Sequence, residues 1–170
     1  MQFTFLGALV AGFAATLVMS VMMKMAGRAG MTDMPPMELV TGSMLTGEPD
    51  KAKQYGLVLH WLMMGTVVFG VGYAVVFNVL DSAGWLTGVA VGAVHGLVLG
   101  AVFMPMMPAM HPRMSSERFL EGPVRTGGGT VTLAAPGLFG ARWGGMTPVG
   151  LVMGHVVYGL VAALVYQRFL

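Results

Sequence analysis

Sulfur and imidazole side chains are the groups in this sequence with the most distinctive chemistry. The chain has 18 methionines and four histidines but no cysteine. A thioether sulfur is a soft ligand suited to Cu(I), and an imidazole suits copper, zinc and iron. The segment MPMMPAMHPRM, residues 104–114, places five methionines around His111. The absence of cysteine excludes disulfides and thiolate metal sites, which leaves methionine and histidine as candidate ligands.

Three of the histidines fall inside predicted helices, at similar depths. Counted from one end of the helices at ~1.5 Å per residue, His60 lies about 6–9 Å inside, His155 about 12 Å and His95 about 16 Å. An imidazole in hydrocarbon is costly unless it is paired or functional, so these histidines are candidate site residues. His111 lies just beyond the third helix. The predicted metal ligands are His60, His95, His155, His111, Met63, Met64, Met104 and Met107.

Three interpretations of this cluster remain open. The cluster can bind a soft metal such as copper. Alternatively, it can hold haem b between His60 and His155, which lie at well-matched depths. It can also bind nothing, because methionine is a flexible core filler and a neutral imidazole can hydrogen-bond a hydroxyl or carbonyl on a neighbouring helix. Pro105, Pro108 and Pro112 count against a regular ligand face here, because prolines are expected to break the helix.

The elements that position these residues are predicted to be transmembrane helices. Of the 170 residues, 56% are apolar and only 9% are charged, and the mean hydropathy is +0.77. A helix needs ~20 apolar residues to cross the ~30 Å hydrocarbon layer. The sequence therefore predicts an all-α polytopic membrane protein, a single domain of four transmembrane helices in a bundle. The predicted spans are about 3–25, 56–79, 84–106 and 147–168.

Charged residues predict the orientation of these helices. The long connections, about 26–55 and 107–146, fall on one side of the membrane, and both termini fall on the other. Arg168 alone is basic on the side of the termini, and the other cations lie on the opposite side: Lys24, Arg28, Lys51, Lys53, Arg113, Arg118, Arg125 and Arg142. The positive-inside rule then places both long connections in the cytoplasm and both termini outside.

A four-residue glycine period marks the third predicted helix, at Gly84, Gly88, Gly92, Gly96 and Gly100. Such a period leaves a flat face on which a neighbouring backbone can approach closely. We expect this helix to lie at the centre of the bundle. Its candidate partners are glycines of the first and fourth helices: Gly7, Gly12, Gly150, Gly154 and Gly159. Glycine-lined faces of this kind can also join a homo-oligomer or a larger membrane complex.

Each long connection carries one further pattern. In TDMPPMELVTGSML, residues 32–45, Thr32 or Asp33 can cap a short amphipathic helix whose apolar stripe includes Met37, Val40 and Met44. This helix is expected to lie on the cytoplasmic interface or to fold back beneath the bundle, where it can act as a lid. The glycine-rich segment RTGGGT, residues 125–130, is predicted to be a flexible loop.

Several functions are excluded by missing residues. No carboxylate lies inside a predicted span, so a di-iron carboxylate site and an acidic proton relay lack their residues. The basic residues are dispersed, so the expected partner is the lipid bilayer and not a nucleic acid. The leading interpretation is a small non-enzymatic membrane protein, a subunit of an oligomer or complex, with a copper-type His/Met site in its cytoplasmic half. The alternatives are a haem b electron carrier and a small channel or transporter.

Three segments of the sequence together resemble a known group of proteins. TDMPPMELVTGSML after the first helix, MPMMPAMHP at the end of the third and GHVVYG in the last resemble a group of small bacterial four-helix inner-membrane proteins. The resemblance spans nearly the whole chain. It implies a bacterial inner-membrane origin and a helical bundle, and it assigns no activity and no catalytic residue.

Overall fold

The computed structural model describes residues 1–117, 119 and 121–170 and is mostly helical, at 69%. It has long apolar helices at the positions of the four predicted spans, and the second and third of them extend further than expected. Arg118, one of the predicted cytoplasmic cations, lies outside the described residues. The four segments long and apolar enough to cross a membrane are α1 (Phe5–Arg28), Pro49–Val79, Trp85–Met110 and Thr147–Phe169.

The second and third segments each contain a π-helical stretch. The second consists of α3 (Pro49–Gly56), η1 (Leu57–Phe69) and α4 (Gly70–Val79), and the third of α5 (Trp85–Val98), η2 (Leu99–Phe103) and α6 (Met104–Met110). The prediction that Pro105 and Pro108 break the helix is wrong, because both lie within α6. The wider π-turn that precedes Pro105 gives room for the proline ring, which would otherwise clash with the carbonyl four residues earlier.

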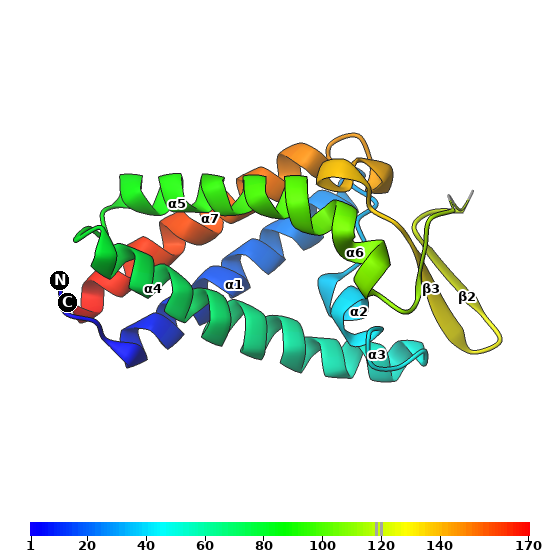
Figure 1. The fold of residues 1–170 in the computed structure, drawn as a ribbon, viewed down its shortest axis with the longest axis horizontal. Helices are drawn as coiled ribbons and strands as arrows, with labels where there is room; N and C mark the ends of the chain where they lie inside the picture. Colours follow the sequence, from blue (N-terminus) through cyan, green and yellow to red (C-terminus); the bar gives the residue numbers. More distant parts are fainter. Residues whose placement is uncertain (118, 120) are drawn as a thin grey trace.

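The fourth segment, α7 (Thr147–Tyr166) with its last turn η4 (Gln167–Phe169), contacts the other three. It packs against α1, α4 and α5, whereas α5 packs mainly against α7. Figure 1 shows α5 along the top of the molecule and α7 running diagonally between α5 and α1. The prediction that the third helix is central is therefore wrong, and its outer face carries exposed side chains such as Leu86 and Val94.

Glycines bring α5 and α7 into backbone contact. A Cβ atom added at Gly88 would meet the carbonyl oxygen of Gly159, and one added at Gly92 would meet that of His155 and lie 2.9 Å from the Cα of Val156. Backbone atoms cannot give way without moving a whole helix. This glycine face is therefore filled by another helix of the same chain.

The other glycines proposed as partners of the third helix pack elsewhere. A Cβ added at Gly12 of α1 would lie 2.7 Å from the Cα of Gly70, in the second segment. One added at Gly154 of α7 would lie 3.2 Å from the terminal methyl of Met19, on α1. The expectation that Gly12 and Gly154 face the third helix is therefore wrong, because α1 packs between the second and fourth segments.

The first long connection holds the predicted amphipathic helix in a shorter form, α2 (Met37–Gly42), which packs against α3 and η1. Neither predicted cap residue makes a capping hydrogen bond. Instead, the Thr32 hydroxyl lies 2.6 Å from the hydroxyl of Thr147 at the start of α7. The buried face of α2 consists of Leu39 and Val40, whereas Met44 of the predicted stripe is exposed.

The second long connection forms a small three-stranded sheet, so the all-α prediction is too narrow. Its strands, in the order β1-β3-β2, are β1 (Met114–Ser115), β2 (Val124–Gly127) and β3 (Thr130–Ala134). Val131 and Leu133 alternate with threonines along β3 and are fully buried. This period of two is what a sheet with one covered face requires.

A two-residue turn joins β2 to β3, and the prediction of a flexible loop at RTGGGT is wrong. Gly127 pairs with Thr130, and between them Gly128 and Gly129 have φ angles of 56° and 75°. Positive φ at both central residues matches the twist of a tight hairpin, and glycine adopts it without steric cost.

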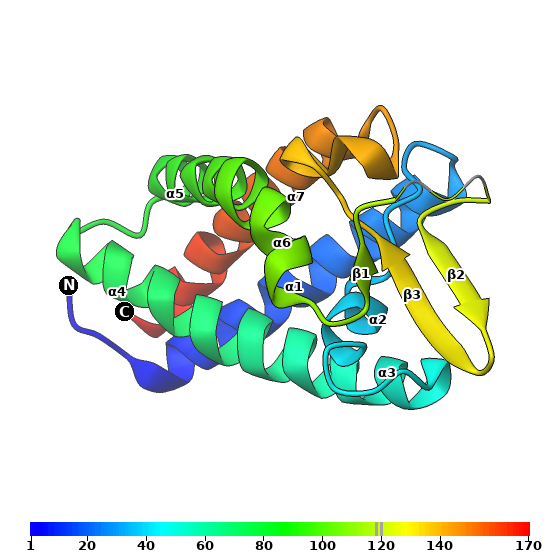
Figure 2. The same cartoon turned by 45° about the vertical axis from the view of Figure 1, so that its right-hand side comes forward.

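Two clusters of buried side chains hold the ends of the molecule together. The first packs α1 and α4 against α7 and includes Phe77 and Tyr166, and the second joins α2, the sheet and the 3₁₀ turn η3 (Leu138–Trp143) through Val40, Leu133 and Trp143. Both termini lie at one end of the molecule, and α2, α3 and the sheet lie at the other (Figures 1 and 2).

Candidate functional site

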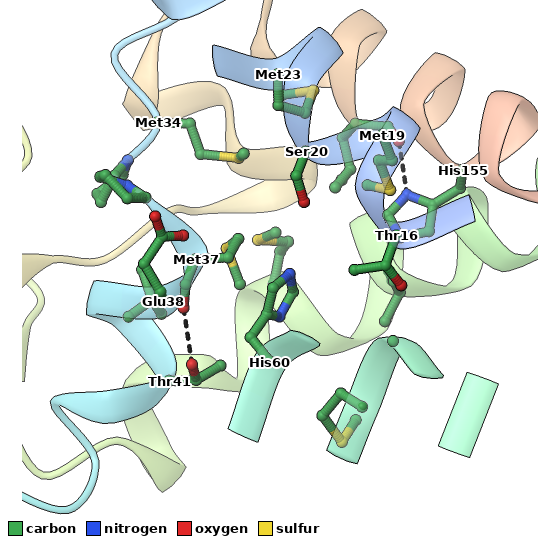
Figure 3. Close-up of a pocket in the computed structure, with 18 of the residues that line it drawn as sticks. Thr16, Met19, Ser20, Met23, Met34, Met37, Glu38, Thr41, His60 and His155 are labelled. Atoms are coloured by element: carbon green, nitrogen blue, oxygen red, sulfur yellow. Dashed lines mark hydrogen bonds between the residues drawn. The ribbon is translucent and has the colours of Figure 1, made fainter. Parts of the chain in front are cut away.

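A cavity of about 650 Å³ lies where the helical segments meet α2. All four histidines and half of the 18 methionines line it. The methionines are Met19, Met23, Met34, Met37, Met44, Met64, Met104, Met107 and Met110. Figure 3 shows several of these sulfur atoms pointing toward the same space as His60. The structure thus brings together residues from all four helical segments and the first connection.

His155 has its tautomer set by the backbone. Its Nδ1 lies 2.7 Å from the carbonyl oxygen of Leu151, one turn earlier on α7, and the side chain is 7% exposed. A carbonyl oxygen can only accept, so Nδ1 carries the proton and donates it. In the neutral ring, Nε2 then has a free lone pair. Anchoring one ring nitrogen in this way is how proteins orient a histidine that binds a metal.

His95 lies against His155, with ring centroids 4.6 Å apart. Its Nδ1 is 3.1 Å from the hydroxyl of Tyr73, and its ring also contacts Phe69 at a centroid distance of 4.5 Å. Its Nε2 is buried and has no hydrogen-bond partner among the described residues. A buried polar atom without a partner is rare in folded proteins, so the Nε2 of His95 is a candidate contact for a ligand in the cavity.

His60 comes from the π-helical stretch η1 and faces the cavity from a different helix (Figure 3). Within the described residues, it is the only histidine without a side-chain hydrogen bond. The distortion of η1 is held by Tyr158, whose hydroxyl donates to the carbonyl oxygen of Gly65 at 2.6 Å. Stretches of π-helix are frequent at functional sites, where they change the direction of a side chain.

His111 differs from the other three, because both of its ring nitrogens are engaged. Nδ1 accepts from the backbone N–H of Arg113 at 3.1 Å, so Nε2 carries the proton and donates to the carbonyl oxygen of Val40 at 2.8 Å. The hydroxyl of Ser43 lies 3.2 Å from the same nitrogen. His111 is 3% exposed and ties the end of α6 to α2, which leaves it no lone pair for a metal.

The four methionines predicted as sulfur ligands lie in three different environments relative to the cavity. Met64 and Met107 line the cavity, and Met104 does so from within the second buried cluster, where it is 4% exposed. Met63 does not line the cavity and is 50% exposed. The one-residue difference between Met63 and Met64 turns their side chains toward different surroundings, and the helical spacing from His60 could not distinguish them.

Sequence reasoning missed the methionines of α1 and of the first connection. Met19 and Met23 are four residues apart on α1, and Met34 and Met37 flank the two prolines before α2. All four line the cavity (Figure 3). The four-residue spacing on α1 was a usable signal, because it places both sulfurs on one helix face. The contribution of Met34 and Met37 depends on how the first connection folds back, which helical periodicity does not reveal.

The donor set favours a soft metal over a harder one. In the described part of the chain, no three histidine or acidic side chains lie close enough together to hold an ion. Zinc and non-haem iron sites are usually built from three or more such nitrogen, oxygen or thiolate ligands. An ion held in this cavity would therefore need thioether ligands in addition to imidazole.

Charged groups occur at one edge of the cavity. Lys24, Arg28 and Glu38 are among its lining residues. Lys24 Nζ lies 3.8 Å from Glu38 Oε1 and 5.9 Å above the ring of Trp61. The Lys24 side chain is 57% exposed, so this pair contributes little to stability. The Lys24–Glu38 pair places polar groups at the edge of a cavity whose walls are otherwise largely apolar.

No family model, curated protein or solved structure matches the chain. The class of protein is therefore indicated by the helices themselves. Four helices apolar enough to cross a membrane suggest an integral membrane protein. In such a protein, His60, His95 and His155 would lie in helices that cross the hydrocarbon layer, where unpaired polar groups are kept mainly for a function.

Proposed function

We propose that this chain is a small, non-enzymatic integral membrane protein that binds Cu(I) in the His/Met cavity. The observation that carries the proposal is the composition of the cavity wall, which contains nine methionines and all four histidines. Thioether and imidazole together are a ligand set that prefers Cu(I). A structural role alone would not require half of the methionines to line a single space.

His155 and His60 are the proposed nitrogen ligands. His155 has a free Nε2 lone pair, because its Nδ1 donates to Leu151, and His60 has no side-chain hydrogen bond among the described residues. Met19 and Met64 are the proposed sulfur ligands, since both line the cavity and belong to different helices. Flexible thioether side chains can close around an ion without moving the backbone.

Copper content tests this proposal. After purification in mild detergent and loading with Cu(I), we expect a His60→Ala/His155→Ala variant to hold about one copper per chain less than the wild type, because both proposed nitrogen ligands are removed. Elemental analysis by mass spectrometry measures the loss. Met63→Leu is the matched control, since Met63 is an exposed methionine next to the proposed ligand Met64. Equal copper in the double variant and the wild type, with both folded, would refute the proposal.

Haem b is the second candidate ligand, favoured by the size and the edge of the cavity. A volume of about 650 Å³ exceeds what a single ion needs. Lys24 and Arg28 at the edge could pair with the two carboxylates of a haem. In this alternative, His60 and His155 would be the axial ligands. A Soret absorption band in the purified protein that disappears in the same double variant would favour haem over copper.

The proposed orientation has both long connections in the cytoplasm and both termini outside, in a bacterial inner membrane. It is supported by the basic residues of the two connections and by the position of α2, α3 and the sheet at one end of the molecule (Figure 1). The cavity, which borders α2, would then lie in the cytoplasmic half.

Single-cysteine labelling tests this orientation, since the chain contains no cysteine of its own. Thr126→Cys lies on the exposed strand β2, and Leu80→Cys lies in the short connection between α4 and α5. In intact cells, we expect a membrane-impermeant maleimide to label Leu80→Cys and to label Thr126→Cys only after the membrane is opened. The reverse pattern would invert the topology.

A further inference from the structure

A second methionine-rich groove lies between α1 and α7. It has a volume of about 450 Å³ and is lined by eleven residues, six of which are methionines. In the whole chain, methionine accounts for 18 of 170 residues. Among the described lining residues there is no histidine and no carboxylate. The methionines are Met22, Met23, Met25, Met31, Met146 and Met153.

The packing of α1 against α7 brings these sulfur atoms together. Met22 and Met25 are three residues apart on α1, and Met146 and Met153 are seven residues apart at the start of α7. Both spacings place the two members on one face of their helix. Gly150 lies between Met146 and Met153 and has no side chain, and a Cβ added there would lie 3.7 Å from the terminal methyl of Met23 on α1.

Contact with lipid does not by itself explain why these residues are methionines. Met25, Met31, Met146 and Met153 are between 46% and 63% exposed. Comparable exposed positions elsewhere on the four helices are filled largely by leucine, valine and phenylalanine. Leucine, valine and phenylalanine are as well suited to contact with lipid as methionine is. What methionine adds is a soft sulfur lone pair.

The groove adjoins the His/Met cavity, and two residues line both spaces. Met23 lines both spaces, as does Thr32 at the start of the first connection. Figure 3 shows Met23 at the wall of the cavity, between Met34 and Met19 in this view. Met23 is therefore the methionine whose thioether borders both spaces.

We propose that this groove is a second soft-metal site, with thioether ligands only, which takes Cu(I) at the surface of the protein and passes it to the His/Met cavity through Met23. The transfer of Cu(I) from the groove to the cavity rests on the proposed function. Binding of a soft metal in the groove is independent of it. Thioether ligands select monovalent soft cations and bind Zn²⁺ weakly, because they lack charge and hardness.

Titration with Ag(I), a soft monovalent cation with no redox change under these conditions, tests the groove. We expect the detergent-purified wild type to bind about two Ag(I) per chain and a Met22→Leu/Met146→Leu/Met153→Leu variant to bind about one, since leucine keeps the volume and removes the sulfur. The matched control is Met63→Leu/Met106→Leu, two exposed methionines outside both spaces. We expect the control to match the wild type.

A second measurement uses the wild type alone and does not depend on how a variant folds. Ag(I) should slow the oxidation of Met146 and Met153 by dilute peroxide several-fold, and should leave Met63 and Met106 unchanged, as read by peptide mass spectrometry. Undiminished Ag(I) binding in the triple variant, or oxidation of Met146 and Met153 unaffected by Ag(I), overturns the groove site. Undiminished binding in His60→Ala/His155→Ala instead overturns the proposed function, so the two failures are distinguishable.

Discussion

A Gly92→Leu substitution should separate α5 from α7 and destabilise the protein by about 3 kcal/mol or more, at the upper end of the cost of overpacking a core. A Cβ at this position would meet the carbonyl oxygen of His155 and lie 2.9 Å from the Cα of Val156. Both contacts are backbone, so no rotamer change can relieve them. The helices must move apart, and the dispersion contacts along the whole α5–α7 interface weaken with them.

The same substitution should also disturb the cavity. Gly92 meets α7 at His155, and His155 is in ring contact with His95 on α5. A shift between the two helices therefore changes the distance between the two imidazoles. We expect Gly92→Leu to lose bound copper as well as thermal stability, although residue 92 contributes no ligand.

Gly72→Leu is the matched control, because a Cβ added at Gly72 has nothing within 4 Å. Thermal unfolding in mild detergent, followed by circular dichroism, compares the two variants with the wild type. We expect the unfolding midpoint of Gly72→Leu to remain near that of the wild type. Similar midpoints for both variants would show that α5 and α7 do not rely on close backbone contact.

The spacing of glycines predicted the close approach of Gly88 to Gly159 on the fourth helical segment, but it did not predict the neighbours of Gly12 and Gly154. Gly88 and Gly92 have the same spacing as many helix-packing motifs, and they do contact α7. Gly12 contacts Gly70 of the second segment. Nothing in the sequence around Gly12 indicates that it contacts this segment and not α5. The pairing depends on which faces remain after all four helical segments are arranged, and that is a property of the whole chain.

The histidines illustrate the same limit at the site. Depth along the helices predicted that His60, His95 and His155 could meet, and all three line the cavity. His111 lines it too, yet its nitrogens bond the backbone of Val40 and Arg113. Whether a histidine is available to a ligand depends on its tertiary neighbours, so residue type and depth were not enough to distinguish His111 from the others.

The hairpin was predictable from local sequence and was missed for a different reason. Two glycines between a strand-like VRT and an alternating TVTL are a known signal for a two-residue turn. The flexible-loop interpretation used glycine content alone and ignored the apolar Val131 and Leu133 on either side of Thr132. Alternation of apolar residues, when combined with the glycine pair, would have predicted β2 and β3.

Trp143→Ala should be the most damaging substitution at the other end of the molecule, with a loss of about 3–5 kcal/mol, the usual cost of truncating a fully buried tryptophan. Trp143 is 0% exposed, and its indole Nε1 donates to the carbonyl oxygen of Ala134 at 2.8 Å. Its own carbonyl oxygen accepts from the backbone N–H of Asp33 at 2.8 Å and from the hydroxyl of Thr147 at 2.9 Å. The residue therefore links β3, the first connection and α7.

The substitution removes the side chain but keeps the backbone carbonyl, so the damage should spread from the sheet. The carbonyl of Ala134 loses its indole donor, and the indole leaves a space beside the buried Leu133. Trp85→Ala is the matched control, since Trp85 is 57% exposed at the start of α5. Thermal unfolding in mild detergent should show a large fall in the midpoint for Trp143→Ala and a small one for Trp85→Ala. Equal decreases in the unfolding midpoint of the two variants would mean that the second buried cluster does not hold the two connections against α7. The end of the cavity formed by α2 would then not be stabilised by this cluster.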